Sequence, residues 1–168
     1  MPVRYAEHRD IDELLSMRNH YITNSQATFD ERILCEGDVR NWMEGFSNSG
    51  PYYLLVAEHQ GTILGFSSSQ AYRSHPAFLS TVETSIYVSP ENMSTGIGTS
   101  LYKTLFHLLE GHHLHRAVVG IALPNDASVR LHTKFGFSSV GTFSEYARKN
   151  GQYISSLWME RALTAKME

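Results

Sequence analysis

A strand, a glycine-containing turn and a helix follow one another between residues 82 and 110, and this run constrains the fold most. Apolar or β-branched residues alternate with other side chains in V-E-T-S-I-Y-V, and a period of two predicts a strand. Ser89-Pro90 ends it, because proline lacks the N–H that a strand ladder requires. Beyond T-G-I-G, leucines recur at three- and four-residue steps, which predicts a helix with one apolar face. The start of this helix therefore lies close behind the end of the strand.

The start of the predicted helix is suited to bind an anion. The first turn of a helix leaves backbone N–H groups unpaired and carries the positive end of the helix dipole. Gly96 and Gly98 lack the Cβ atoms that would keep a bulky anion away. We therefore expect a phosphate or pyrophosphate to bind here. Glycines before a helix also serve as simple turn residues, and that alternative stays open.

Length and charge limit the number of domains and the kinds of partner. With 168 residues the chain is long enough for one domain, 1–168, and too short for two ordinary ones. Its formal net charge of -3 provides no electrostatic footprint for nucleic acid or for an anionic membrane. The N-terminus lacks an apolar signal core and no long apolar run follows, so we expect a cytoplasmic protein without a membrane partner.

The cysteine and histidine content excludes several site types. Cys35 is the single cysteine, so neither an intramolecular disulfide nor a cysteine-based zinc site is possible. Four of the nine histidines crowd residues 107–115, but without the spacing of a zinc motif, and we expect no metal. Neither G-x-S-x-G nor a P-loop G-K-[ST] is present, which argues against hydrolase and nucleotide-hydrolysing activity.

The rest of the sequence predicts further strands and helices on both sides of this run. Asp10 and Asp38 are the expected N-caps of two early helices, and Asn125 is the expected cap of a short helix ending near Phe135. Strands are expected, in addition to the central one, at residues 3–6, 52–58, 62–70, 117–123, 137–143 and 153–160. The order β-α-α-β-β-β-α-β-α-β-β predicts an α/β domain with a mixed sheet.

At this point the chain resembles the GCN5-related N-acetyltransferases. The resemblance rests on V-E-T-S-I-Y-V-S-P, then T-G-I-G with a helix, then L-P-N-D-A-S-V-R-L-H-T-K-F-G-F. More narrowly the chain resembles the phosphinothricin or methionine-sulfoximine N-acetyltransferases, through A-Y-R before the central strand and K-N-G-Q-Y near the end. The resemblance implies a mixed, mostly antiparallel sheet splayed between two adjacent parallel strands. It also implies acetyl-CoA, a small-molecule amine acceptor and a homodimer.

The resemblance implies that acetyl-CoA lies along the central strand and over the glycine turn. The residues it assigns to cofactor binding are Tyr87, Val88, Ser94, Thr95, Gly96, Ile97, Gly98, Thr99, Asn125 and Ser128. Family members usually carry Gln or Arg and a further basic residue ahead of the first glycine, whereas this chain has Met93, Ser94 and Thr95. Because no guanidinium is available in the loop, we expect weaker acetyl-CoA binding with a shallow salt dependence.

Three groups are expected to carry the chemistry. An ammonium acceptor must lose a proton before it attacks a thioester, and Glu83, on the strand face opposite Val82 and Thr84, is the expected base. An N–H near Val88 is the expected support for the developing oxyanion. Many family members place a tyrosine where this chain has His132, which implies a role for His132 as the acid that protonates the CoA thiolate. An ordinary solvated glutamate and an ordinary helix histidine remain alternatives.

Other residues are expected to bind the acceptor. Arg73, beside Tyr72, resembles an anchor for a substrate carboxylate, because guanidinium binds carboxylate in a bidentate fashion. Lys149 matches a position near the substrate end, and Thr28 and Phe29 match positions that line the pocket. With few fixed cations in the loop after Tyr72, a monocarboxylate such as methionine sulfoximine or sulfone fits better than the doubly anionic phosphinothricin.

These expectations combine into an acetyl-CoA-dependent N-acetyltransferase that acts on a small amino acid or analogue by direct transfer. Two alternatives remain: a non-catalytic acyl-CoA-binding or sensing domain, suggested by the missing loop arginines, and an enzyme that acetylates proteins or peptides. For the homodimer, Trp158 and Tyr153 are candidate contact residues, and both are equally candidates for core strand positions.

Overall fold

The computed structural model describes residues 2–93 and 95–163, and its elements follow the predicted order. The strands are β1 (Val3–Tyr5), β2 (Leu54–His59), β3 (Thr62–Ala71), β4 (Thr81–Val88), β5 (Arg116–Ala122), β6 (Ser138–Lys149) and β7 (Gln152–Ala162). The helices are α1 (Ile11–Asn24), α2 (Glu36–Met43), α3 (Ile97–Leu109) and α4 (Asp126–Lys134). Strands β6 and β7 are longer than the sequence indicates.

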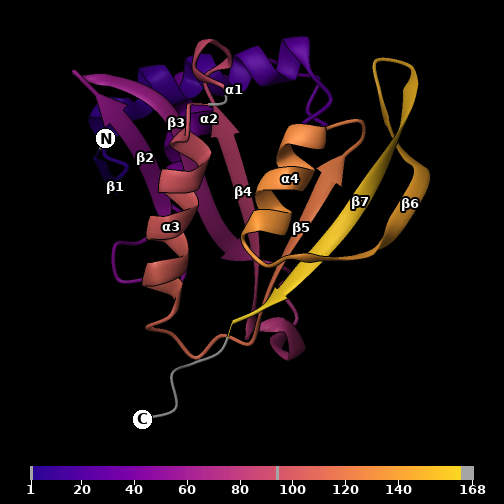
Figure 1. The fold of residues 1–168 in the computed structure, drawn as a ribbon. Coiled ribbons are helices and arrows are strands. Elements are labelled where there is room, and N and C mark those ends of the chain that lie inside the picture. Colours follow the sequence, from indigo (N-terminus) through magenta and orange to yellow (C-terminus); the bar gives the residue numbers. More distant parts are fainter. Residues whose placement is uncertain (1, 94, 164–168) are drawn as a thin grey trace.

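One mixed sheet carries all seven described strands, in the order β1-β2-β3-β4-β5-β7-β6. Strands β4 and β5 pair in parallel, and the other neighbouring pairs are antiparallel. The parallel pairing joins residues 81–83 of β4 to residues 116–118 of β5 and then stops, although both strands continue. The two strands therefore diverge beyond Glu83, as Figure 1 shows, which confirms the expected splay.

Helices cover both faces of the sheet. Figure 1 shows α3 and α4 in front of it and α1 and α2 behind it. The front core gathers apolar side chains of α3 with those of β2, β4 and β5, and the rear core joins α1 and α2 to β2 and β3. Each core buries one apolar helix face against the sheet, which is the main stabilising term in such a layered fold. Residues that point to opposite faces of β4 therefore enter different environments.

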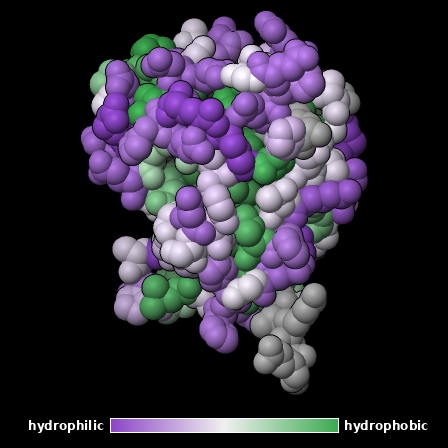
Figure 2. All heavy atoms as spheres, turned by 90° about the vertical axis from the view of Figure 1, so that its left-hand side faces the viewer, coloured by the Kyte–Doolittle hydropathy of each residue, from purple (hydrophilic) through white to green (hydrophobic). Residues whose placement is uncertain are grey.

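The outer surface differs from one side to another. The side shown in Figure 2 is covered mainly by hydrophilic residues, with hydrophobic residues in separate patches. The long β6–β7 hairpin, by contrast, exposes large apolar side chains: Val140, Phe143, Tyr146 and Tyr153. In the part of the chain that the structure describes, no helix is long and apolar enough to cross a bilayer.

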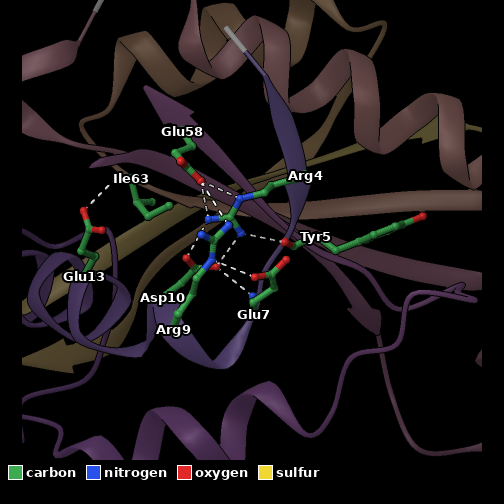
Figure 3. A network of polar contacts seen from close by, with 8 residues as sticks. All are labelled: Arg4, Tyr5, Glu7, Arg9, Asp10, Glu13, Glu58 and Ile63. Carbon is green, nitrogen blue, oxygen red and sulfur yellow. Dashed lines mark hydrogen bonds and ion pairs between the residues drawn. The ribbon is translucent and has the colours of Figure 1, made fainter. Parts of the chain in front are cut away.

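Asp10 lies at the predicted helix start but binds different groups. It occupies the N-cap position of α1, yet its carboxylate makes no capping bond and lies in a short 3₁₀ turn. Arg4 binds it through two N–H···O contacts of 2.8 Å, and the Glu7 N–H donates a further bond (Figure 3). Burial by itself would raise the pKa of Asp10, but these hydrogen bonds outweigh it and lower the pKa. Asp10 thus ties β1 to the start of α1.

The predicted cap of the second helix is wrong by three positions. Helix α2 begins at Glu36 with Cys35 as its N-cap residue, and Asp38 lies in the first turn. The Asp38 carboxylate accepts a 2.8 Å bond from the Cys35 N–H and binds Arg32. A first-turn acid that reaches back to the N-cap N–H resembles a cap in sequence, because both place a carboxylate near the helix start.

Candidate active site

A cavity of about 300 Å³ lies where β4 and β5 diverge. Its walls come from α1, the loop that follows it, α2, α4 and the strands β3 to β7. Among the residues that the sequence analysis assigned to the site, those on the wall are Thr28, Phe29, Glu83, Tyr87, Asn125, Ser128 and His132. These residues are up to about a hundred positions apart in the chain, and the splayed sheet brings them together.

Glu83 is half-buried on the rear face of β4 and lines the cavity. Its neighbours Val82 and Thr84 point to the front face and are buried, as the period-two pattern predicts. Burial raises the pKa of Glu83 above its ordinary value. Among the described residues it has no hydrogen-bond or ion-pair partner. A carboxylate that is desolvated and unpaired accepts a proton more readily than an exposed one.

The end of β4 is held in place by two tyrosines. The Tyr21 hydroxyl donates a 2.6 Å hydrogen bond to the Val88 carbonyl, and the Tyr87 hydroxyl donates to the Ala27 carbonyl at 3.1 Å. Burial raises the pKa of Tyr87 to about 12, so this hydroxyl stays neutral. The Ser89 N–H donates to β3, and peptide groups alternate sides along a strand, so the Val88 peptide groups point away from β3. This direction matches the expected oxyanion donor.

On the front face, a chain of hydrogen bonds runs from β4 to α4. The Tyr102 hydroxyl lies 2.8 Å from His132 Nε2 and 3.4 Å from Thr84 Oγ1. His132 Nδ1 lies 2.7 Å from the Ser128 carbonyl, which can only accept, so Nδ1 carries the proton and Nε2 accepts from Tyr102. His132 is 1% exposed, and burial lowers its pKa. The arrangement describes a neutral imidazole with both ring nitrogens paired.

Asn125 fulfils the capping role predicted for it. Its side chain accepts a 3.1 Å hydrogen bond from the Ser128 N–H at the start of α4. Both residues line the cavity, so capping and contact with a bound molecule are compatible. Position 128 therefore reaches the cavity from the first turn of α4.

The start of α3 presents unpaired N–H groups, as the sequence analysis expects. Ser100 is the first residue whose N–H reaches the Gly96 carbonyl, at 3.0 Å, so the three N–H groups before it have no backbone acceptor among the described residues. They belong to Ile97, Gly98 and Thr99. Thr95 is exposed before this turn, and Ser94 lies outside the described residues. A diphosphate fits such a turn.

Glycine is needed at the two positions of this turn for different physical reasons. Gly96 has φ = 86°, a left-handed conformation that side chains rarely adopt, and open space lies where a Cβ would be. Gly98 is helical, and a Cβ there would lie 3.0 Å from Leu131 of α4. From the sequence, both glycines are expected to give an anion access to the turn. Gly98 instead allows α3 and α4 to approach.

Lys134 is a cation at this turn that the sequence analysis missed. Its Nζ lies 3.3 Å from Thr99 Oγ1, in the first turn of α3. Lys134 is on the last turn of α4, 35 positions further along the chain. No local pattern indicates this proximity, because it depends on how α4 packs on α3.

Three residues expected at the acceptor end do not line the cavity. Arg73 is exposed, with its guanidinium 5.1 Å from the centre of the Tyr72 ring. Tyr72 in turn packs edge-on against Trp158, which does line the cavity. Lys149 is 3% exposed, and its ammonium donates hydrogen bonds to the carbonyls of Ser25 and Thr28. Lys149 thus shapes the loop that contributes Thr28.

Arg18 lines the cavity, although nothing in the sequence singles it out as a site residue. It lies on α1, and its guanidinium is 4.2 Å from the centre of the Trp42 ring. Among the described residues that line the cavity it is the sole lysine or arginine. An arginine within an amphipathic helix usually points to solvent, so sequence alone provides no signal for this placement.

Comparison with known proteins identifies the family. Residues 3–158 match the model of the "Acetyltransferase (GNAT) domain". The chain is 42% identical over 163 residues to a phosphinothricin N-acetyltransferase of Streptomyces coelicolor, which covers 96% of this chain and 95% of that protein. It is 29% identical to an L-methionine sulfoximine/L-methionine sulfone acetyltransferase of Salmonella typhimurium, over 97% and 95% of the two chains.

Solved structures of the same class superimpose closely. A ribosomal-protein-alanine N-acetyltransferase from Brucella melitensis has a TM-score of 0.92 at 29% identity, over 97% of this chain and 100% of that one. A phosphinothricin acetyltransferase from Sinorhizobium meliloti, in complex with acetyl-CoA, has a TM-score of 0.90 at 26% identity, over 96% and 88%. The fold and site thus define an acyl-transferring α/β protein. The chain belongs to the GNAT acetyltransferase family, which confirms the resemblance seen in the sequence.

Proposed function

We propose that this protein is an N-acetyltransferase that transfers an acetyl group from acetyl-CoA to the amine of a small amino acid or analogue. The observation that carries the proposal is Glu83, an unpaired, half-buried carboxylate in a cavity between diverging parallel strands. Relatives that act on phosphinothricin and on methionine sulfoximine match nearly the whole chain, which supports a small amino-acid acceptor. A cavity of about 300 Å³ suits a molecule of that size.

Acetyl-CoA supplies the acetyl group as a thioester. Glu83 removes a proton from the acceptor ammonium, directly or through one water, because its raised pKa makes it a competent base near neutral pH. The Val88 N–H points to the open side of β4 and supports negative charge on the carbonyl oxygen. His132 lines the cavity from α4 and is the proposed proton donor to the departing sulfur, a role in which Nε2 must first take up a proton and exchange its bond to Tyr102 for one to the sulfur. Its low pKa leaves it mostly neutral, so its contribution is smaller than that of Glu83.

The diphosphate of acetyl-CoA binds at the first turn of α3, residues 96–99. Its donors are the N–H groups of Ile97, Gly98 and Thr99, which have no backbone acceptor among the described residues, and Thr95 is a further polar contact. Ser94, which the resemblance also assigns to the cofactor, lies outside the described residues. Lys134 supplies the positive charge that the loop itself lacks. The pantetheine arm lies along β4, and the residues that line its path are Tyr87, Val88, Asn125 and Ser128. In this proposal one cation replaces the basic residues usual at this turn.

The active protein is a cytoplasmic homodimer in which the whole chain forms one catalytic domain. The exposed apolar side chains of the β6–β7 hairpin, Val140, Phe143, Tyr146 and Tyr153, supply a surface for the partner copy. Tyr153 is 65% exposed, whereas Trp158 lines the cavity, so Tyr153 is the contact candidate of the two. Sedimentation at micromolar concentration should show a dimer, and Tyr153→Asp with Phe143→Asp should shift it to the monomer.

An activity screen tests the main proposal. Release of CoA is measured with free amino acids, phosphinothricin and methionine sulfoximine, and with peptides bearing N-terminal alanine as a second panel. Turnover of a free amino acid or analogue is expected. Turnover of peptides alone would instead support a protein acetyltransferase, a possibility favoured by the similarity to the Brucella enzyme. Binding of acetyl-CoA without turnover of any amine would indicate an acyl-CoA-binding domain.

A further inference from the structure

Arg18 is an unpaired cation inside the cavity that contains Glu83. It is half-buried on α1, and its guanidinium lies over the Trp42 ring at 4.2 Å. Among the described residues it has no hydrogen-bond or ion-pair partner. Stacking on an aromatic ring fixes a guanidinium plane and leaves its N–H edge free. The edge of Arg18 is therefore available to a molecule in the cavity.

The surroundings of Arg18 favour a bound anion. Burial lowers its pKa, while the nearby Asp30 carboxylate opposes this at a distance beyond an ion pair. Asp38, whose carboxylate binds Arg32, acts in the same direction as Asp30 and likewise makes no ion pair with Arg18, and the aromatic neighbours Tyr87 and Trp42 are neutral. A half-buried cation without a partner is unfavourable, and an incoming carboxylate relieves this by forming a bidentate, charge-assisted pair.

The acceptor needs such an anchor, and the residue expected from sequence does not provide it. Arg73 is exposed and does not line the cavity. Arg18 and Glu83 line the same cavity, with Arg18 reaching it from α1 and Glu83 from the rear face of β4. We propose that the Arg18 guanidinium binds the α-carboxylate of the acceptor amino acid while its amine lies toward Glu83. This inference rests on the proposed function and specifies its substrate class.

The proposal predicts which amines are accepted. A free α-amino acid presents its carboxylate two bonds from its amine, whereas an amino acid amide or the N-terminus of a peptide has no charge at that position. The enzyme should therefore prefer free acids over their α-amides. The side chain of the acceptor is left to the aromatic and apolar wall, which includes Phe29, Phe66 and Trp158.

The test compares an acid with its own amide. Steady-state kinetics and calorimetric binding are measured for methionine sulfone and methionine sulfone amide, with wild type, Arg18→Met and Arg18→Lys. Arg18→Met should raise KM for the acid about tenfold to hundredfold, the range for a lost charge-assisted pair, and leave KM for the amide unchanged. Arg18→Lys should recover part of the loss. Arg40→Met, at an exposed position on α2, is the matched control and should change neither.

Several results would overturn the proposal. An equal loss for acid and amide would make Arg18 a structural residue, and a selective loss in Arg73→Met alone would return the anchor to Arg73. Equal turnover of acid and amide by the wild type would refute the carboxylate anchor while leaving acetyl transfer intact. If no amine is turned over, the proposed function fails, and calorimetry still decides whether the acid binds through Arg18.

Discussion

Buried polar groups are left unpaired on one face of β4 and are joined by hydrogen bonds on the other. On the rear face, Glu83 and Arg18 are half-buried and unpaired among the described residues. On the front face, Thr84, Tyr102 and His132 are buried and joined by hydrogen bonds. Unpaired ionisable groups keep their capacity to take a proton or bind an ion, whereas a satisfied network holds its members in one arrangement. The strand thus separates a reactive wall from a rigid one.

The largest effect should come from removing the unpaired carboxylate. Glu83→Gln should lower kcat by about 10²–10⁴-fold, because a general base contributes that much, and should leave the Kd for acetyl-CoA unchanged. The acid limb of the kcat/KM profile, expected above the range of an ordinary glutamate, should disappear. Glu44→Gln, at an exposed position after α2, is the control. Unaltered turnover in Glu83→Gln would show that both faces of β4 are structural.

Substitutions in the hydrogen-bond network of the front face should lower the stability of the protein. Tyr102→Phe removes the donor to His132 Nε2, which is fully buried, and should lower the free energy of unfolding by about 1–3 kcal/mol. The pair Tyr53–His112, with a 2.6 Å contact, is a matched control because His112 is partly accessible to water. Tyr53→Phe should lower the free energy of unfolding by about 0.5–1.5 kcal/mol. Equal losses in urea denaturation would mean that the front network has no special rigidity.

A smaller effect, on acetyl-CoA binding, is expected at the end of the front face where Lys134 lies beside the first turn of α3. Lys134→Gln should weaken acetyl-CoA binding about two- to fivefold, the range for an exposed ion pair, and should reduce the salt dependence of the Kd. Arg148→Gln, an exposed cation on β6, should change neither quantity. A Kd that keeps its salt dependence in Lys134→Gln would remove this lysine from the site.

The smallest effect is a pH dependence of stability on the rear face. Since the folded state raises the pKa of Glu83, the native protein binds more protons than the unfolded chain between the two pKa values. The free energy of unfolding should therefore contain a term that declines as pH rises through this window. In Glu83→Gln the decline should be missing, so the variant gains stability relative to wild type at pH 7 and less at pH 4. Thermal unfolding at both pH values measures this difference.

Much of the fold follows from local pattern. Alternation in residues 82–88 predicted β4 and also the opposite directions of Glu83 and Thr84, because strand geometry has a period of two. The sequence indicates Asn125 as a cap because asparagine directly before a helix is a preferred N-cap residue, and its bond to the Ser128 N–H confirms this. Asp38 was misplaced by the same kind of reasoning, since a first-turn carboxylate and a cap have similar local signatures. Local rules thus predict element type and face better than element ends.

By itself the sequence determined the order of strands and helices, the helix start whose N–H groups at residues 97–99 have no backbone acceptor among the described residues, and the face of β4 that carries Glu83, because each depends on neighbours within a few positions. Only the tertiary structure decided which distant side chains meet. It placed Arg18 beside the cavity instead of Arg73, Lys134 beside Thr99, and Lys149 in the loop after α1. These placements depend on the splay of β4 from β5 and on helix packing, and contacts between residues far apart in the chain leave no periodic trace in the residues that make them.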